Sequence, residues 1–214
     1  MWMINIIFSK CSNFIIGILF PPYCYVCKKE NTQLCDSCLQ HFAQAVDTPS
    51  PYITSIYSFK DPHIKKIIHA IKYFHRKDLI TPFAKIMSSE ILKEKEYTTY
   101  ILLPIPMPPL RKYTRGYNHT EALAQQIHTE TSLTLRTKTL LRNPCVSKKR
   151  QVQTKSRKER MRNQHNAFIV NEPVKGMNII LIDDVATTGA TLLEARRVLL
   201  EHGVSRVIAY TIAH

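Results

Sequence analysis

The segment from Asn178 to Thr191 constrains the fold more than any other part of this 214-residue chain. It reads NIILIDDVATTGAT: an apolar run, two acids, a short turn and the first residues of a helix. The apolar run predicts a buried strand that brings Asp183 and Asp184 to the edge of a sheet. The residues from Thr187 to Thr191 predict a turn whose backbone N–H groups and hydroxyls surround one point at a helix N-terminus, an arrangement that favours an anion.

The two halves of this segment suggest one kind of ligand. Paired carboxylates can accept hydrogen bonds from vicinal sugar hydroxyls or approach a magnesium-bound ligand. They would repel a phosphate beside them, so a ligand should place its sugar near the acids and its phosphate in the turn, as a ribose 5-phosphate unit does. Gly189 permits close backbone approach. An ordinary helix cap would need only one of the five residues from Thr187 to Thr191. The segment also lacks the Gly-Lys-Thr of a Walker loop and the repeated glycines of a dinucleotide fingerprint.

Strands and helices alternate along the rest of the chain, which favours an α/β fold with a parallel sheet covered on both faces. The ligand is then expected beyond the carboxyl ends of the strands, after Ile105 and after Ile182. In the helix around Ile64 to Ile71, Lys65, Lys66 and Lys72 are interpreted as a solvated face. The expected strands are 52–59, 100–105, 178–182 and 206–212, and further helices are expected at 78–93, with Asp78 as its cap, at 118–130 and after Gly189 up to His202.

Four cysteines form a C-x2-C pair, seven intervening residues and a second C-x2-C pair: Cys24, Cys27, Cys35 and Cys38. Two tight turns of this spacing can present four thiolates to one tetrahedral ion, which is the geometry of a structural zinc site. A disulfide pair would suit a secreted chain, and a redox C-x-x-C would not need to occur twice. Cys11 and Cys145 stand alone and are interpreted as ordinary small side chains.

The chain is strongly basic, with 30 Lys and Arg against 16 Asp and Glu and a net charge of +14. Such a surplus favours an anionic partner: nucleic acid, a phosphorylated ligand or an acidic membrane face. The densest basic stretch, 136–162, has no apolar period and is expected to be a mobile loop or a weakly formed helix. Its candidate nucleic-acid contacts are Lys148, Lys149, Arg150, Lys155, Arg157, Lys158, Arg160 and Arg162.

The first twenty residues are apolar but interrupted from Ser9 to Asn13, so they predict no transmembrane segment. No charge precedes Lys10 and no pair of small residues marks a cleavage site. We therefore interpret this stretch as an amphipathic helix and not as a signal peptide. A cytoplasmic location with reduced thiols is the expectation that follows.

The motif at 179–191 resembles the signature that binds phosphoribosyl diphosphate (PRPP) in type I phosphoribosyltransferases. Further motifs along the chain are the four-cysteine module, Leu103-Pro104-Ile105-Pro106, Arg115-Gly116-Tyr117-Asn118, and Arg162-Asn163 ahead of Ala167-Phe168. With these motifs and the PRPP loop, the chain from about Pro21 to His214 is similar to the ComF family of competence-associated proteins. His119 departs from that family, which usually has Gln there.

The resemblance implies a Rossmann-like parallel sheet of the type I phosphoribosyltransferase kind at 49–214, preceded at 1–48 by a helix and a small zinc-ribbon module. It implies that PRPP binds with Mg²⁺, the acids contacting the ribose hydroxyls and the turn holding the 5-phosphate. The residues concerned are Asp183, Asp184, Ala186, Thr187, Thr188, Gly189, Ala190 and Thr191. In the turn after Ile105, Arg111, Lys112 and Arg115 are candidates for the diphosphate, with a solvated basic loop as an equal alternative.

The resemblance also implies a role in natural transformation, namely the handling of incoming single-stranded DNA in the cytoplasm. Other DNA-uptake proteins at the inner face of the membrane are expected as partners. The alternative is an active phosphoribosyltransferase, a glycosyltransferase that moves a ribosyl phosphate from PRPP to an acceptor, although no segment can be assigned to that acceptor. A third possibility is a zinc-stabilised interaction domain that has inherited the fold. No histidine is assigned any of the chemistry.

Overall fold

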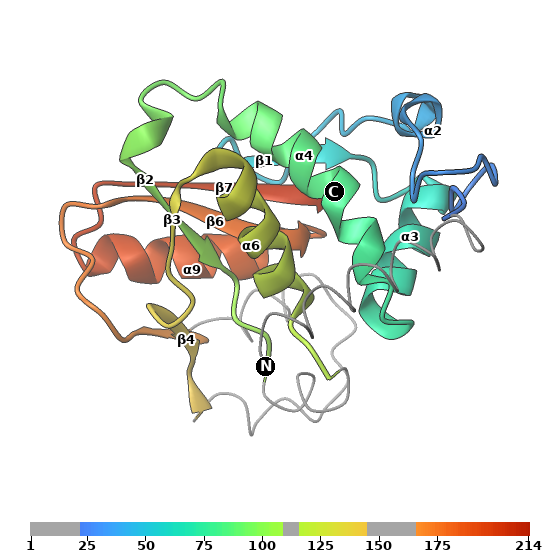
Figure 1. Cartoon of the computed structure of the whole chain (residues 1–214). Helices are drawn as coiled ribbons and strands as arrows, with labels where there is room; N and C mark the ends of the chain where they lie inside the picture. Colours follow the sequence, from blue (N-terminus) through green and yellow to red (C-terminus); the bar gives the residue numbers. More distant parts are fainter. Residues whose placement is uncertain (1–21, 109–115, 145–165) are drawn as a thin grey trace, which may run out of the picture. The chain divides into compact units, whose positions relative to one another are not determined.

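The computed structural model describes residues 22–108, 116–144 and 166–214 (Figure 1). The chain divides into two compact units, one ending at Phe42 and the other running from Ala43 to His214. The predicted N-terminal helix lies outside the described residues. In the described part of the first unit, the one α-helix is α2 (Asp36–His41), which begins directly after Cys35 and contains Cys38. No described helix combines the length and the apolar character that crossing a bilayer requires.

The second unit contains a five-stranded parallel sheet in the order β1-β7-β6-β2-β3 (Figure 1). The apolar residues of β6 from Ile179 to Ile182 are almost completely buried, because β6 pairs with β7 on one side and with β2 on the other. The predicted α/β fold with a parallel sheet is confirmed. The strands are β1 (Ile53–Tyr57), β2 (Tyr100–Pro104), β3 (Thr134–Leu135), β6 (Asn178–Val185) and β7 (Arg206–Ala213).

Helices cover both faces of this sheet. The apolar side of α9 (Ala190–Glu201) packs in one core cluster with Ile179 and Leu181. The intervening residues Ile180 and Ile182 are buried as well and face the opposite side. Helices α4 (Ile80–Ile91) and α6 (His119–Thr131) pack on each other, α6 also contacts β2 and β6, and α4 contacts β7. The other helical segments in the described part of this unit are α3 (Pro62–Tyr73) and the short 3₁₀ helices η1 (Lys77–Leu79) and η2 (Tyr97–Thr99).

The start of α4 differs from the prediction. The N-cap of α4 is Leu79, which makes no side-chain capping bond. Asp78 belongs to η1 and its two carboxylate oxygens accept hydrogen bonds from Arg76 at 2.8 and 2.6 Å. A neighbouring guanidinium therefore takes the carboxylate that would otherwise be free to cap the helix.

The basic stretch 136–162 is also more ordered at its beginning than expected. Leu140–Arg142 forms β4, which pairs antiparallel with β5 (Phe168–Val170). Leu140 and Phe168 are buried, so this two-stranded ladder adds to the apolar core beneath α9. The expectation of a loop was therefore wrong for β4, and residues 145–165 lie outside the described part of the chain.

Candidate functional site

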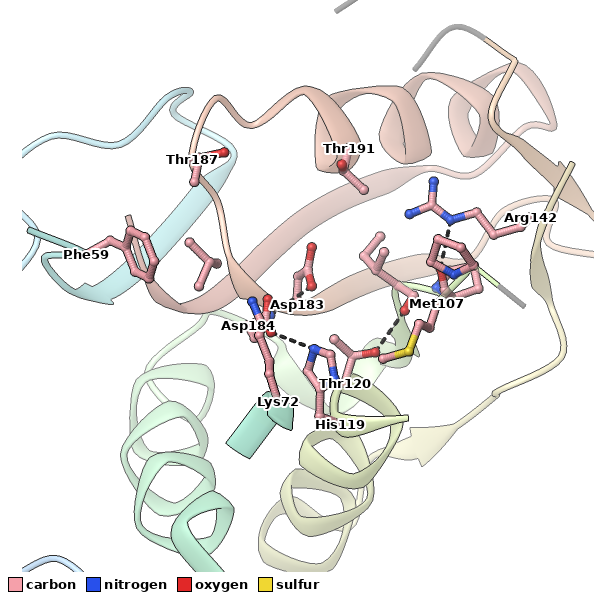
Figure 2. Close-up of a pocket in the computed structure, with 14 residues that line it drawn as sticks. Phe59, Lys72, Met107, His119, Thr120, Arg142, Asp183, Asp184, Thr187 and Thr191 are labelled. Atoms are coloured by element: carbon pink, nitrogen blue, oxygen red, sulfur yellow. Dashed lines mark hydrogen bonds and ion pairs between the residues drawn. The ribbon is translucent and has the colours of Figure 1, made fainter. Parts of the chain in front are cut away.

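A cavity of about 280 Å³ opens at the carboxyl ends of β2 and β6, where ligands of parallel sheets bind. Side chains from five elements and the connections between them meet there (Figure 2). The segment Ile105–Pro108 after β2 forms part of its wall. The polar residues that line it are Lys72 of α3, His119 and Thr120 of α6, Arg142 of β4, Asp183 and Asp184 of β6, and Thr187 and Thr191 of the following turn and α9.

The two acids of β6 have different surroundings. Asp184 is only 7% exposed, and its Oδ2 lies 2.7 Å from Nζ of Lys72 and 2.6 Å from Nε2 of His119. Asp183 is partly exposed and accepts a hydrogen bond from the Asp184 N–H at 2.9 Å. Figure 2 shows the Asp183 carboxylate in the open middle of the site, away from the Asp184–His119 pair. Asp183 is thus the acid that a ligand can reach, and Asp184 is held by two side chains.

The environments shift the two carboxyl pKa values in opposite directions. Burial, together with the negative charge of Asp184, raises the pKa of Asp183 to about 7. Burial also acts to raise the pKa of Asp184, but the hydrogen bond from His119 and the charge of Lys72 outweigh it and hold that pKa below its usual range. The site therefore keeps one acid ionised while the other titrates near neutral pH.

The turn between β6 and α9 leaves backbone donors unused. Within the described residues, the N–H groups of Thr187, Thr188, Gly189 and Thr191 donate to no protein acceptor. Ala186 differs, because its N–H donates to the Ala213 carbonyl at 2.9 Å and its carbonyl lies 2.6 Å from Nδ1 of His214. The free N–H groups gather at the N-terminus of a twelve-residue helix, where an anion is favoured.

Gly189 permits this turn for a reason that the sequence did not reveal. It has a left-handed φ of +69°, and a Cβ added there would lie 3.0 Å from two side-chain carbons of Pro49 and 3.1 Å from Cδ1 of Ile53. The segment before β1 thus packs directly against the glycine. We expected Gly189 to allow the backbone to approach a ligand, and the structure shows in addition that it accommodates Pro49 and Ile53.

Three cationic or titratable side chains of the cavity were not assigned to it from the sequence. Lys72, interpreted as part of a solvated face, reaches Asp184 from the last turn of α3 (Figure 2). His119 follows the Asn118 cap of α6 and is only 6% exposed. One sequence feature could have drawn attention to His119 as a site residue, namely its departure from the Gln that the ComF family usually has at this position.

Arg142 is the third of these residues. Its Nε donates to the Pro106 carbonyl at 2.8 Å, and its guanidinium carbon lies 4.4 Å from the centre of the Phe168 ring. These contacts hold one positive charge at the cavity wall opposite Thr187 (Figure 2). Arg142 could not be predicted as a cavity residue, because the sequence around it contains many other basic residues. The β4–β5 pairing is what places it at the cavity wall.

The four cysteines of the first unit come together, all as free thiols. Their Sγ atoms lie within 4.8 Å of one another, with 3.9 Å between Cys24 and Cys38 and 3.6 Å between Cys27 and Cys35. A tetrahedral zinc site with bonds of about 2.3 Å has S–S edges of about 3.8 Å, so the cluster fits such an ion. Lys28 and Asn31, which have positive φ values, turn the chain between the two cysteine pairs.

The other predicted site residues lie outside the described parts of the chain. They are the diphosphate candidates Arg111, Lys112 and Arg115 and the nucleic-acid candidates Lys148, Lys149, Arg150, Lys155, Arg157, Lys158, Arg160 and Arg162. Their roles stay predictions.

Known proteins resemble the chain in sequence and in fold. It is 26% identical to the DNA utilization protein YhgH of Salmonella typhimurium over 87% of this chain and 80% of that protein. It is 32% identical to the competence protein ComFC of Bacillus subtilis over 70% of this chain, and it spans 58% of that relative. Among solved structures, a hypoxanthine phosphoribosyltransferase of Staphylococcus aureus has 15% identity and a TM-score of 0.40, over 62% of this chain and 61% of that one.

The phosphoribosyl transferase domain family matches residues 82–214, which include β2, α6, β6 and the turn that follows β6. The matched residues supply most of the cavity wall. This chain therefore belongs to the phosphoribosyltransferase-domain family, among its ComF and YhgH proteins, and carries a four-cysteine cluster ahead of that domain.

Proposed function

We propose that the cavity binds PRPP or a similar ribose 5-phosphate ligand. The observation that carries the proposal is the set of unused N–H groups at Thr187, Thr188, Gly189 and Thr191 in the same cavity as the accessible Asp183 carboxylate. A sugar phosphate matches both, because its phosphate accepts hydrogen bonds from the amides and its hydroxyls donate to the acid. Mg²⁺ would accompany the ligand, since oxygen donors suit this ion.

We further propose that the protein handles single-stranded DNA in the cytoplasm during natural transformation, with other DNA-uptake proteins as partners at the inner membrane face. Two relatives are named a competence protein and a DNA utilization protein, and the net charge of +14 supports an anionic partner. The PRPP-type pocket would then serve recognition or regulation.

Calorimetric titration tests the pocket. Mg²⁺-PRPP is titrated into the wild-type chain and into Asp183→Asn, which removes the accessible carboxylate and keeps its size. We expect binding in the wild type and a loss of at least tenfold in the variant. Tight binding that is equal in both proteins would contradict the proposed role of the acid. Binding of a labelled single strand is measured by fluorescence anisotropy on the same samples.

An active phosphoribosyltransferase is the second candidate, and Arg142 favours it. Arg142 and Thr187 lie on opposite sides of Asp183 in the cavity (Figure 2). A ligand whose 5-phosphate sits in the turn could therefore direct its diphosphate toward Arg142. A guanidinium suits a diphosphate because it can donate two parallel hydrogen bonds to phosphate oxygens. Release of pyrophosphate from Mg²⁺-PRPP, with a panel of bases and nucleic acids as acceptors, tests this activity. Release that requires Arg142 would favour the enzyme.

The four-cysteine cluster is proposed to bind one structural Zn²⁺. Four thiolates at the S–S distances found here fill a tetrahedral coordination shell and leave no position for a reacting molecule. The ion would hold the first unit together, because the described part of this unit, residues 22–42, has few buried apolar residues.

A further inference from the structure

Three aromatic rings gather at the surface where α3 ends: His69, Tyr73 and Phe74. The ring centroid of His69 lies 4.6 Å from that of Tyr73 and 5.4 Å from that of Phe74. Tyr73 is 54% exposed and Phe74 is 64% exposed. Single exposed apolar side chains are ordinary, but a cluster of exposed rings is characteristic of a binding surface. We call these three residues the aromatic platform.

The chain segment that carries the platform contains basic residues and no acid. No acid occurs in the sequence from Pro62 to Lys77, which contains Lys65, Lys66, Lys72, Arg76 and Lys77. The acids at either end of this stretch are engaged, because Asp61 caps α3 and Asp78 pairs with Arg76. Lys72 and Arg76 are paired with acids, but Lys65, Lys66 and Lys77 are exposed. The rings therefore share a helix and its C-terminal turn with exposed positive charges, which favours a partner that is both anionic and able to stack.

The platform adjoins the cavity. Lys72 precedes Tyr73 and turns inward to Asp184, while Tyr73 and Phe74 face solvent.

A row of rings also connects the end of α3 with the cavity. Beyond Phe74, the His75 ring lies 5.7 Å from that of Tyr117, which in turn lies 6.4 Å from that of His119 in the cavity wall. The Tyr117 hydroxyl donates to the Ile71 carbonyl, and Nζ of Lys77 lies 4.8 Å from its ring centre. Aromatic and basic side chains thus continue from the cavity to the surface.

We propose that the aromatic platform stacks the bases of single-stranded DNA, with Lys77 contacting the backbone. This proposal deepens the proposed DNA-handling function and rests on it. A duplex hides the faces of its bases, whereas a single strand presents a flat ring at each nucleotide and a phosphate between them. That alternation matches the platform and its lysines. Stacking does not depend on the base, so recognition would be independent of sequence, as a protein that handles arbitrary incoming strands requires.

Fluorescence anisotropy with the full chain tests the platform. The probes are a labelled deoxythymidine strand of about 20 nucleotides and a strand of equal length and charge that lacks bases. We expect Phe74→Ala to weaken binding of the thymidine strand about fivefold or more and to leave the salt dependence unchanged. Lys77→Ala should reduce the slope of log K against log salt by about 0.7. The wild type should bind the strand without bases at least as weakly as Phe74→Ala binds thymidine, because that strand loses stacking on all three rings.

Matched variants control for unfolding and for general loss of aromatic surface. Phe74→Trp should retain wild-type affinity, because it keeps a stacking ring. Tyr52→Ala removes another exposed ring, one that stacks with Arg196 just before the amino end of β1, and should leave binding unchanged. Equal affinities of Phe74→Ala and wild type for the thymidine strand would overturn the platform. It would also be overturned if the ratio of the affinity for the thymidine strand to that for the strand without bases were the same in both proteins.

Other outcomes identify which proposal fails. If the wild type bound no single strand, the DNA part of the proposed function and the platform would both be wrong. If it bound strands normally but not Mg²⁺-PRPP, the pocket alone would be wrong. A fall in melting temperature of Phe74→Ala with unchanged DNA affinity would show that the rings are covered by protein, and would also overturn the platform.

Discussion

Asp183 and Asp184 are neighbours in sequence, yet the structure gives them separate tasks. Successive residues of a strand point to opposite sides, so the two carboxyls meet different elements. Asp184 points to the side where α3 and α6 bring Lys72 and His119, and it is buried between them. Asp183 has no such cation at hydrogen-bonding distance among the described residues and faces the cavity. Asp183 therefore adds a negative charge to the cavity only when its carboxyl group is deprotonated.

The titration of Asp183 predicts pH-dependent ligand binding. With its pKa raised to about 7, Asp183 is protonated in acid and a poorer acceptor for ribose hydroxyls. Affinity for Mg²⁺-PRPP should rise about tenfold between about pH 6 and pH 8. Calorimetry in this range measures it. Asp183→Asn is the control for titration of the ligand itself, and an equally steep pH dependence in that variant would show that Asp183 does not contribute.

His119 is predicted to stabilise the fold through Asp184. Removal of the imidazole in His119→Ala leaves a buried carboxylate with one partner fewer and should lower the free energy of unfolding by about 1 to 3 kcal/mol. His119→Gln restores the residue usual in the ComF family and keeps an N–H donor, so it should recover most of that loss. Urea unfolding at neutral pH gives both values.

Acid should reduce this difference. The folded-state pKa of Asp184 is held below its usual value near 3.9, so the contribution of the carboxylate is complete above that pH and is lost as pH falls. The difference between the two variants should therefore begin to shrink below about pH 4 and disappear only as pH falls through the lowered folded-state pKa of Asp184. A gap that is independent of pH would mean that His119 acts by packing alone.

At the scale of elements, the turn between β6 and α9 depends on one glycine. Gly189→Ala would place a non-glycine residue at φ +69° and a Cβ 3.0 Å from Pro49. The left-handed conformation costs about 1 to 2 kcal/mol, and the contact with Pro49 adds to it. We expect a lower melting temperature and weaker Mg²⁺-PRPP binding, because the free N–H groups would move.

Gly176 is a matched control for this prediction. Its φ of +77° carries a similar backbone penalty, but nothing lies within 4 Å of an added Cβ. Gly176→Ala should therefore lose stability by the backbone term alone and bind Mg²⁺-PRPP normally. If the two variants lost equal stability and bound equally, the packing of Pro49 against the turn would not matter.

The contiguous motif at 178–191 could be predicted from the sequence, whereas the contact of Lys72 with Asp184 could not. The strand, acids and turn at 178–191 are contiguous, so their local pattern determined both their structure and their place at the sheet edge. Lys72 lies four residues after the buried Ile68, at the border of the apolar stripe of α3. Whether such a long side chain meets water or Asp184 depends on where the helix ends against the sheet, which periodicity does not record.

The contacts missed at the cavity are likewise long-range. His119 and Asp184 are 65 positions apart, and Arg142 takes its place only when β4 pairs with β5 across the basic stretch. An apolar period of β4 could not be read in three residues among many charges. Loop closure of this kind depends on the whole fold and not on the spacing of neighbouring residues.

At the scale of the molecule, the two compact units have different sources of stability. The unit from Ala43 to His214 buries a large apolar cluster on each face of its sheet. The described part of the unit ending at Phe42 has few buried side chains, two of which, Cys24 and Cys35, are cysteines of the cluster. Removal of the metal ion should therefore destabilise the first unit strongly and the second unit little.

The final prediction is that one Zn²⁺ per chain holds the first unit without supporting the pocket. Cys24→Ser should lose the ion, because a hydroxyl replaces one of four thiolates, and protease should then cleave before Ala43 while leaving the rest intact. Mg²⁺-PRPP affinity should change less than twofold, since every polar residue of the cavity wall belongs to the second unit. Metal analysis and limited proteolysis measure the outcome. Cys145→Ser, which changes a cysteine outside the cluster, should keep the ion; a metal content that followed Cys145 and not Cys24 would place the ion elsewhere.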